Sequence, residues 1–327
     1  MAKPSIWIAL ILSTLVLLCL FPLLTVKTSP LSPYFEDNGR LKVLSTTAMI
    51  DDLVGEIGGE RVDHVALIVG NLDPHSYELV KEDGEKLERA HLIFYNGLGL
   101  EHGASLHHYL KRKGAVALGD DLLSKRREDF IWLGDQVDPH FWMDVGLFSE
   151  VVPLIVERLC EQLPEHAAQF RKEGERVRSA LLEADQSFLQ KMQSIVPDRR
   201  YLVTGHDAFN YFARKYLKDP SEIEWQRRTI APEGLAPDGQ MGVMDIWKVV
   251  NFVLNYRLSV IFPEANVNCD ALEKVISICH ERGAHVRLAP VPLYGDTMGE
   301  GEARAQTYLQ MVEHNVSVLY KYLSESS

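Results

Sequence analysis

The segment from Pro164 to Val196 has the longest periodic pattern in the chain, and it constrains the fold more than any other stretch. Its apolar residues recur every three, four or seven positions, as on one face of an α-helix: Phe170, Val177, Leu181, Ala184, Phe188, Met192 and Ile195. Pro164 suits the first turn of such a helix, and Pro197 lies just beyond its end. About 30 helical residues would extend roughly 45 Å, which is long enough to run the length of a protein with two lobes.

Short apolar runs alternate with helical patterns on both sides of this segment. Before it, we predict strands at 41–45, 62–69, 91–95 and 115–118, and helices at 49–57, 77–89, 100–111 and 145–160. After it, we predict strands at 201–204, 259–262 and 285–289, and helices at 209–216, 244–255, 270–282 and 301–323. This alternation is typical of parallel sheets. We therefore predict an α/β fold with lobes at 41–162 and 197–327, joined by one long rigid helix over 163–196.

The N-terminus has the pattern of an export signal. Lys3 supplies positive charge, and Ile6 to Leu24 is almost wholly apolar, so we predict a signal peptide over residues 1–26. Residues 27–40, with prolines and serines, are predicted to be a tether. Cys19 could accept a lipid, although Leu18 stands where lipoprotein signals usually have a small residue. The sequence thus predicts a periplasmic protein, either free or anchored to a membrane.

Charge and cysteine content exclude several classes of function. The formal net charge of −12 argues against nucleic-acid binding and suits a cation as ligand. Three cysteines lie beyond the signal, and they form no Cys-x-x-Cys pair: Cys160, Cys269 and Cys279. A thiolate zinc site or a thioredoxin-like redox site is therefore not expected. The helix over 270–282 would separate Cys269 from Cys279 by roughly 15 Å, too far for a disulfide. We expect the chain to be a monomer.

One tripeptide occurs twice, as Asp73-Pro74-His75 and Asp138-Pro139-His140. Proline fixes its own φ angle and favours extended backbone before it, so each copy presents an imidazole from a stiff turn. A third histidine, His206, and an aspartate, Asp296, each follow a short apolar run. In α/β proteins, ligands bind at the carboxyl ends of strands. We therefore predict that His75, His140, His206 and Asp296 hold a metal ion in the cleft between the lobes.

Each of these residues also has a structural interpretation, because a loop histidine is more often solvated or buried in a core than bound to metal. We expect Asp73 and Asp138 to bond their own backbone. Asp207 and Glu264 are candidates to orient an imidazole, and Glu264 is the main competitor of Asp296 as fourth ligand. The other histidines are expected to be structural or, on the helix over 100–111, solvated: His102, His107 and His108.

Three imidazoles and one carboxylate suit Zn²⁺, Mn²⁺ or Fe²⁺ and disfavour copper(I). Four protein ligands can close a tetrahedron around the ion, which leaves no open position for a reactive water. The chain has no phosphate-binding loop, nucleophile elbow or His-Glu-x-x-His helix. A metallohydrolase with three protein ligands and a metal-bound water is the competing hypothesis, and a surface adhesin or structural lipoprotein is a third.

The chain resembles a known family, the cluster A-I (TroA- and ZnuA-like) solute-binding proteins that serve ABC importers as metal receptors. The resemblance runs from about Lys42 to the C-terminus and is carried by these segments: 73–78 (DPHSYE), 96–101 (NGLGLE), 138–144 (DPHFWMD), 204–209 (TGHDAF), 232–234 (PEG), 264–268 (EANVN) and 293–296 (LYGD). It implies two lobes bridged by a rigid helix, no enzymatic activity, and one divalent ion as cargo for a membrane permease. The family's ligand positions fall on His75, His140, His206 and Asp296.

Two features of this chain bear on the metal that the resemblance implies. Manganese-selective members often have glutamate at the third ligand position, where this chain has His206. Zinc-scavenging members carry a loop rich in histidine and acid, whereas Lys111 to Gln136 contains no histidine. The resemblance therefore leaves zinc, manganese and iron open. With ordinary histidine pKa values, we expect metal affinity to fall below about pH 6.

Overall fold

The computed structural model describes residues 32–237, 241–299 and 305–325. The chain divides into two compact units, Met1–Asn38 and Gly39–Ser327. In the first unit, the described residues include the short helix α2 (Ser32–Phe35). The predicted signal peptide, Cys19 and most of the predicted tether lie outside the described residues. Within the part that is described, no helix is both long and apolar enough to span a bilayer.

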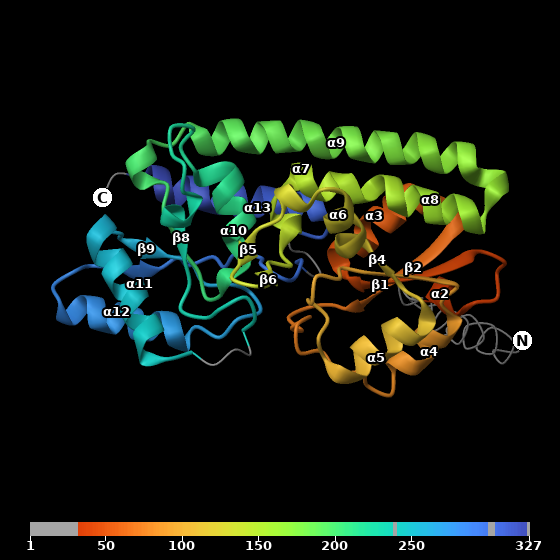
Figure 1. Cartoon of the computed structure of the whole chain (residues 1–327), viewed down its shortest axis with the longest axis horizontal. Coiled ribbons are helices and arrows are strands. Elements are labelled where there is room, and N and C mark those ends of the chain that lie inside the picture. Colours follow the sequence, from red (N-terminus) through yellow and green to blue (C-terminus); the bar gives the residue numbers. More distant parts are fainter. Residues whose placement is uncertain (1–31, 238–240, 300–304, 326–327) are drawn as a thin grey trace, which may run out of the picture. The chain divides into compact units, whose positions relative to one another are not determined.

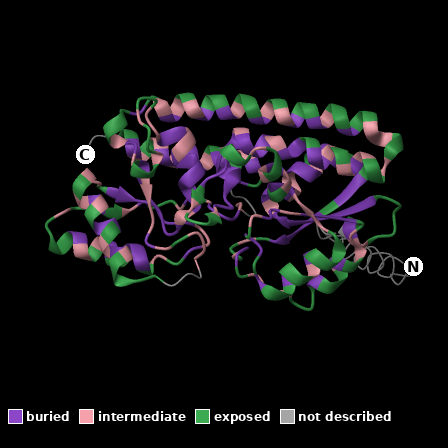
Figure 2. Cartoon of the chain, in the orientation of Figure 1, coloured by how far each residue is buried: buried purple, intermediate pink, exposed green. Residues whose placement is uncertain are grey.

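The second unit begins with a parallel four-stranded sheet in the order β2-β1-β3-β4. Its strands are β1 (Leu41–Thr47), β2 (Val62–Ile68), β3 (Leu92–Tyr95) and β4 (Val116–Ala117). The central strand β1 is buried along its whole length, as a strand covered on both faces must be (Figure 2). Helix α3 (Ala48–Gly58) packs on one face of the sheet, and α4 (Asp83–Arg89) and α5 (Ala104–Lys113) lie on the other (Figure 1). The short α6 (Leu118–Lys125) follows β4.

The predicted helix over 77–89 begins only at Asp83, and the reason is the side chain of Glu78. Its carboxylate accepts hydrogen bonds from the backbone N–H groups of Ala104 (2.6 Å) and Ser105 (2.8 Å). These are the first two residues of α5, whose N–H groups have no partner within their own helix. Glu78 therefore serves as an external cap for α5, and its own segment is not helical.

The chain then forms an antiparallel hairpin, β5 (Trp132–Leu133) and β6 (Gln136–Val137), before the segment that carries His140. The predicted helix over 145–160 is divided in two, α7 (Val145–Phe148) and α8 (Val152–Gln162). Pro153 stands in the first turn of α8, where its missing N–H is tolerated, so the second helix starts afresh there.

The long central helix predicted from periodicity is confirmed as α9 (Ala167–Gln193), preceded by a 3₁₀ turn at Pro164–His166. Its buried residues follow the predicted apolar stripe, with one polar exception, Asp185. Helix α9 packs against α3 and α8 near its start and against α13 (Tyr308–Ser324) further along (Figure 1). It therefore contacts both halves of the unit.

The second half contains two parallel strand pairs, β7 (Leu202–Val203) with β8 (Thr229–Ile230), and β9 (Val260–Ile261) with β10 (Arg287–Leu288). The backbone N–H of Phe262 donates to the carbonyl of Val203 (2.9 Å), which links the two pairs. The helices here are α10 (Asn210–Phe212), α11 (Val243–Tyr256), α12 (Asp270–Glu281) and α13. The predicted helix over 209–216 is a composite of a 3₁₀ turn, α10 and a π-helical turn (Ala213–Leu217). The other 3₁₀ turns are Gly59–Arg61, Arg127–Asp129, Phe141–Met143, Ser149–Val151, Pro197–Arg199 and Trp225–Arg228.

One large hydrophobic core runs through both halves of this unit. It includes Leu41 and Val43 of the first sheet, Phe170 of α9, and Leu319 and Leu323 of α13. A smaller core lies under α11 and α12, around Val249 and Val275. Because the main core is continuous, the two halves are joined by packing as well as by α9.

The three cysteines of the described chain form no disulfide, in agreement with the predicted separation of Cys269 and Cys279.

Candidate metal centre

The two Asp-Pro-His turns share one local geometry. An Asp73 carboxylate oxygen accepts the backbone N–H of His75 (2.9 Å), and Asp138 accepts that of His140 at the same distance. Such an Asx turn fixes the backbone two residues ahead. The prediction that both aspartates bond their own backbone is confirmed.

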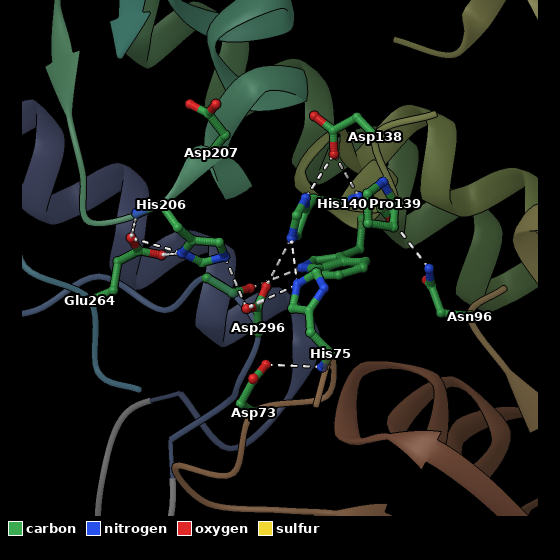
Figure 3. A network of polar contacts seen from close by, with 12 residues as sticks. Asp73, His75, Asn96, Asp138, Pro139, His140, His206, Asp207, Glu264 and Asp296 are labelled. Atoms are coloured by element: carbon green, nitrogen blue, oxygen red, sulfur yellow. Dashed lines mark hydrogen bonds and ion pairs between the residues drawn. The ribbon is translucent and has the colours of Figure 1, made fainter. Parts of the chain in front are cut away.

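The four residues predicted from the sequence lie together at one point (Figure 3). One ligand atom from each of His75, His140, His206 and Asp296 lies within 4.8 Å of the other three. The residues are 2%, 0%, 0% and 4% exposed, respectively. Three nitrogen donors and a carboxylate oxygen therefore converge in a buried space.

Distances between these atoms, from 3.0 to 3.7 Å, lie within a few tenths of an ångström of those around a tetrahedral ion. The Nε2 atoms of His75 and His140 are 3.1 Å apart, and Asp296 lies 3.4 Å from His140 Nε2 and 3.0 Å from His206 Nε2. A tetrahedral ion with bonds of about 2.0–2.2 Å holds its ligand atoms about 3.3–3.6 Å apart. Among the described residues, both oxygens of Asp296 and Nε2 of His206 have no hydrogen-bond partner although they are buried. Buried polar atoms of this kind call for a ligand.

Two of the histidines are oriented through their outer ring nitrogens. His140 Nδ1 lies 2.7 Å from an oxygen of Asp138, and His206 Nδ1 lies 3.0 Å from an oxygen of Glu264. A carboxylate at Nδ1 holds the proton there when the ring is neutral, so that the Nε2 lone pair faces inward once the second proton has left. Both Nε2 atoms are thus presented to the same point.

Burial and charge shift the pKa values of these groups in opposite directions. Burial lowers the pKa of His75 to about 3, and the neighbouring histidines add to the effect while Asp296 opposes it. Burial would also lower the pKa of His140, but Asp138 and Asp296 raise it to about 9. For His206, Glu264 and Asp296 overcome burial and raise the pKa well above its ordinary value. Burial opposes ionisation of Asp296, yet His206 and His140 hold its pKa well below the usual range.

Glu264 lies where one of its two predicted roles would place it, whereas Asp207 does not. One oxygen of Glu264 also accepts the backbone N–H groups of Gly205 (2.9 Å) and His206 (3.0 Å), so it lies on the outer side of the His206 ring. Its position is that of an orienting partner, as one of the two hypotheses proposed. The prediction that Asp207 orients an imidazole is wrong, because its carboxylate points away from the ligand cluster (Figure 3). Burial and the charge of Asp138 raise the pKa of Asp207 to about 7.

Sequence reasoning missed two parts of this site. Asp138 was assigned to the turn alone, although its carboxylate also bonds the His140 ring. His102 is exposed, as predicted, but it precedes α5 instead of lying on the helix, and its ring centroid lies 5.8 Å from that of His75. Asp138 belongs to the tripeptide that carries His140, and this proximity is the signal that could have found its second role. No comparable signal in the sequence places His102 beside His75.

A pocket of about 380 Å³ lies beside the cluster and is lined by His75, His102, Leu98, Pro139 and Gly234, among others. His75 is the only one of the four converging residues among the pocket-lining residues. Access from solvent to the donor atoms therefore passes His75.

The segment Asn96–Gly103 connects the two Asp-Pro-His turns. The Asn96 side chain donates to the carbonyl of Pro139 (3.1 Å), and the carbonyl of His75 accepts the backbone N–H groups of His102 and Gly103. Gly97, Leu98 and Gly99 all have positive φ angles, a conformation that glycine adopts readily and leucine does not. The buried Glu101 carboxylate stabilises this turn by accepting Thr46 Oγ1 (2.6 Å) and the backbone N–H of Asn96 (2.8 Å).

Comparisons with known proteins agree with this geometry. Residues 43–322 match the family described as "ZnuA: Zinc-uptake complex component A periplasmic". The chain is 39% identical over 290 residues to the metal-binding protein YtgA of Chlamydia muridarum, covering 87% of this chain and 86% of the relative. It is 29% identical over 286 residues to the manganese-binding lipoprotein MntA of Bacillus subtilis, covering 87% of this chain and 90% of the relative.

A solved structure shares the fold. The crystal structure of Fe(III)-bound YtgA from Chlamydia trachomatis superposes with a TM-score of 0.81 and 38% identity, covering 88% of this chain and 99% of that one. The predicted fold class, two α/β lobes with parallel sheets and a long joining helix, is confirmed by this match and by α9. The chain belongs to the periplasmic zinc-uptake component A family, the TroA- and ZnuA-like metal-binding receptors of ABC importers.

Proposed function

We propose that this chain captures one divalent metal ion outside the cytoplasm with His75, His140, His206 and Asp296 and delivers it to the permease of an ABC importer. The observation that carries the proposal is the convergence of four buried donor atoms from distant parts of the chain within 4.8 Å. A buried cluster of this kind is costly unless an ion or protons lie between its members.

The donor set indicates a class of cargo rather than one metal. Three imidazoles and one carboxylate suit Zn²⁺, Mn²⁺ and Fe²⁺, and raw affinity would favour zinc among these three. The names of the relatives mention manganese and Fe(III) for those proteins, and the family description mentions zinc. We therefore propose one ion per chain from this group.

A transport role is favoured over catalysis. Four protein ligands complete a tetrahedron, whereas a metallohydrolase needs a position for a reactive water. Glu264, which could have served as a base, instead bonds the outer nitrogen of His206. We propose that the protein is not an enzyme and that it works as a monomer, with no nucleic acid as partner.

The proposed location follows from the N-terminal sequence and the family. Relatives include a lipoprotein, and the family description is periplasmic. We propose that residues 1–26 export this chain, that residues 27–40 form a tether, and that the lobes at 41–162 and 197–327, joined by the helix at 163–196, hold the metal between them.

Metal stoichiometry tests the proposal directly. The chain from Asp37 onward would be titrated with Zn²⁺, Mn²⁺ and Fe²⁺ beside a His75→Ala His140→Ala double variant, with bound metal measured by elemental analysis. We expect one tightly held ion per chain, lost in the variant. Absence of bound metal, or metal that the double variant retains, would show that the paired turns are structural.

A further inference from the structure

The turn that carries His140 precedes α9 in the sequence, but two of its hydrogen bonds lead to residues that follow α9. The Tyr211 hydroxyl donates to the backbone carbonyl of Asp138 (2.9 Å), and the Asn210 side chain donates to the Asp138 carboxylate (3.0 Å). Asn210 and Tyr211 are the first two residues of α10, close behind His206 in the chain. The turn is therefore fixed to the same segment that carries His206.

The carboxylate of Asp138 uses its two oxygens for different purposes. One oxygen accepts the backbone N–H of His140 (2.9 Å) and bonds the ring nitrogen Nδ1 (2.7 Å). The other oxygen accepts a hydrogen bond from Nδ2 of Asn210. Asp138 is fully buried and Asn210 is 4% exposed, so water does not readily replace a lost donor. The amide of Asn210 thus fixes the plane of the carboxylate that orients His140.

The same amide reaches the other histidine turn. Asn210 Nδ2 also lies 3.1 Å from the backbone carbonyl of Asp207, the residue after His206. One side chain therefore connects the turn of His140 to the turn of His206. The ring centroids of the two histidines are 5.3 Å apart.

His75 is held in another way. Its carbonyl accepts the N–H groups of His102 and Gly103, both from the first half of the chain. The Asp73 carboxylate accepts the Ser76 hydroxyl (2.5 Å) and the His75 N–H, and the described contacts of this carboxylate include no hydrogen bond to α10. The identical tripeptides therefore differ in their support, because only the second is bonded to α10.

We propose that Asn210 is a positioning residue for metal binding, which acts through Asp138 to hold the imidazole of His140 in a fixed relation to His206. The Nε2 atoms of His140 and His206 then form a preformed pair of ligand atoms, and His75 and Asp296 complete the set. This inference rests on the proposed function, because it assigns a role in the same metal site.

A double-mutant cycle tests the inference on the full-length chain. The Kd for Zn²⁺ would be measured by competition with a chromophoric chelator for the unaltered chain, Asn210→Leu, Asp138→Ala and the double variant. We expect Asn210→Leu to raise Kd about 10- to 100-fold, as loss of a partner behind a metal ligand does. In the Asp138→Ala background the same change should alter Kd by less than about twofold, because its route to His140 is already removed.

A spectroscopic readout separates positioning from general destabilisation. The visible spectrum of bound Co²⁺ reports ligand geometry, and we expect it to shift in Asn210→Leu. The matched control is Gln193→Ala, which removes another partly buried amide that donates to two carbonyl oxygens, those of Tyr216 (3.0 Å) and Lys218 (2.9 Å). Gln193 bonds none of the four proposed ligands, so this control should leave both Kd and the Co²⁺ spectrum unchanged.

The outcomes are distinct. An unaltered chain that binds no Zn²⁺ contradicts the proposed function itself. If the chain binds Zn²⁺, the inference is overturned by an unchanged Kd and spectrum in Asn210→Leu, or by effects of Asn210→Leu and Asp138→Ala that simply multiply. Should Asn210→Leu fail to fold, the smaller Asn210→Ala enters the same cycle with the same expectations.

Discussion

The indole Nε1 of Trp142 donates a hydrogen bond of 3.0 Å to the carbonyl oxygen of Gly295, a residue 153 positions later in the chain. Trp142 lies two residues after His140, with its ring centroid 5.2 Å from the imidazole, and Gly295 directly precedes Asp296. The Tyr308 hydroxyl adds a bond of 2.6 Å to the carbonyl of Trp142. The His140 turn and the Asp296 loop are thus fastened to each other through their neighbours.

This close fit predicts that Gly295 tolerates no side chain. A Cβ atom at this position would collide with Oε2 of Glu264 and lie 3.3 Å from the His206 ring. We expect Gly295→Ala to raise the Kd for Zn²⁺ at least about 10-fold by displacing His206 from its orienting carboxylate. The control is Gly84→Ala in α4, where a Cβ atom meets nothing within 4 Å. Gly84→Ala should bind Zn²⁺ with unchanged Kd and gain about 0.5–1 kcal/mol of stability. Equal Kd values for the two variants would contradict the prediction.

Asp296 and Glu264 should differ in their contribution to binding. Asp296→Ala removes two carboxylate oxygens that between them face the Nε2 atoms of all three histidines. Glu264→Ala removes only the bond to Nδ1 of His206 and the hydrogen bonds that Glu264 accepts from two backbone N–H groups. We expect Glu264→Ala to weaken binding about 10- to 100-fold and Asp296→Ala to weaken it further. Isothermal titration of both variants measures the order, and the reverse order would make Glu264 the fourth ligand.

Metal affinity should depend on pH at higher values than ordinary histidines predict. In the metal-free chain the pKa of His140 is raised to about 9 and that of His206 well above its ordinary value, so both carry protons at about pH 7. The pKa of His75 is lowered to about 3, so this ring is already neutral. Binding must then release two protons, and the association constant should rise about 100-fold per pH unit near neutrality.

Calorimetry in buffers of different ionisation enthalpy counts these protons. A release of one proton or fewer would contradict the raised pKa values of both rings. The fall in affinity expected from sequence at about pH 6 thus moves to higher pH, because Asp138, Glu264 and Asp296 surround the two imidazoles.

The metal-free protein should be less stable in alkaline solution. A group whose pKa is higher in the folded than in the unfolded state stabilises the fold fully below its unfolded pKa, and this is lost as pH rises through the folded value. For His140 that window runs from about 6.5 to about 9 and corresponds to a loss on the order of 3 kcal/mol. The pKa of Asp207, raised to about 7, likewise makes the fold less stable as pH rises, but at lower pH than His140 does. Thermal melts of the metal-free protein should show a lower Tm at about pH 9 than at about pH 6. The zinc-loaded protein is the control, because His140 carries no extra proton there and so loses none as pH rises. A higher Tm at alkaline pH without metal would be incompatible with these shifts.

Thr297 should slow the release of metal. Its buried hydroxyl donates to the backbone carbonyl of Gly70, in the loop that leads to His75, while Asp296 directly precedes it. We expect Thr297→Val to speed dissociation of Zn²⁺ about 2- to 10-fold, which corresponds to the loss of one neutral hydrogen bond. Thr297→Ser keeps the hydroxyl and should release metal at the original rate. Stopped-flow transfer to a chelator gives both rates, and faster release from the serine variant alone would exclude the hydroxyl as the cause.

Sequence patterns predicted most of the fold because they record burial. The stripe from Phe170 to Met192 appears as the buried face of α9, and the apolar run at 41–45 became the central strand β1. Errors occurred where a distant partner overrode local preference, as at Glu78, or where a proline within the segment started a new helix, as at Pro153. Glu78 caps α5 instead of extending a helix, and Pro153 restarts α8, so the boundaries near both residues differ from those predicted.

The site could be predicted as a set of residues but not as a network. Stiff turns placed His75 and His140, and the carboxyl ends of strands located His206 and Asp296. The two Asp-Pro-His copies are identical in sequence, and the local difference, Ser76 after one and Phe141 after the other, explains only the bond of Asp73 to Ser76. Nothing local predicts that Asp138 bonds both an imidazole and Asn210. That difference depends on α10, which reaches Asp138 only after the chain has folded.

The four converging residues come from four separate segments of the chain, so they meet only in the folded protein. An unfolded chain offers an ion scattered single donors, and the free energy of binding therefore adds to the free energy of folding, by about 2.7 kcal/mol when free metal is at 100 times Kd. The loaded chain opens correspondingly less often than the metal-free one. Its survival against proteases that cut opened chains consequently rises and falls with the supply of metal.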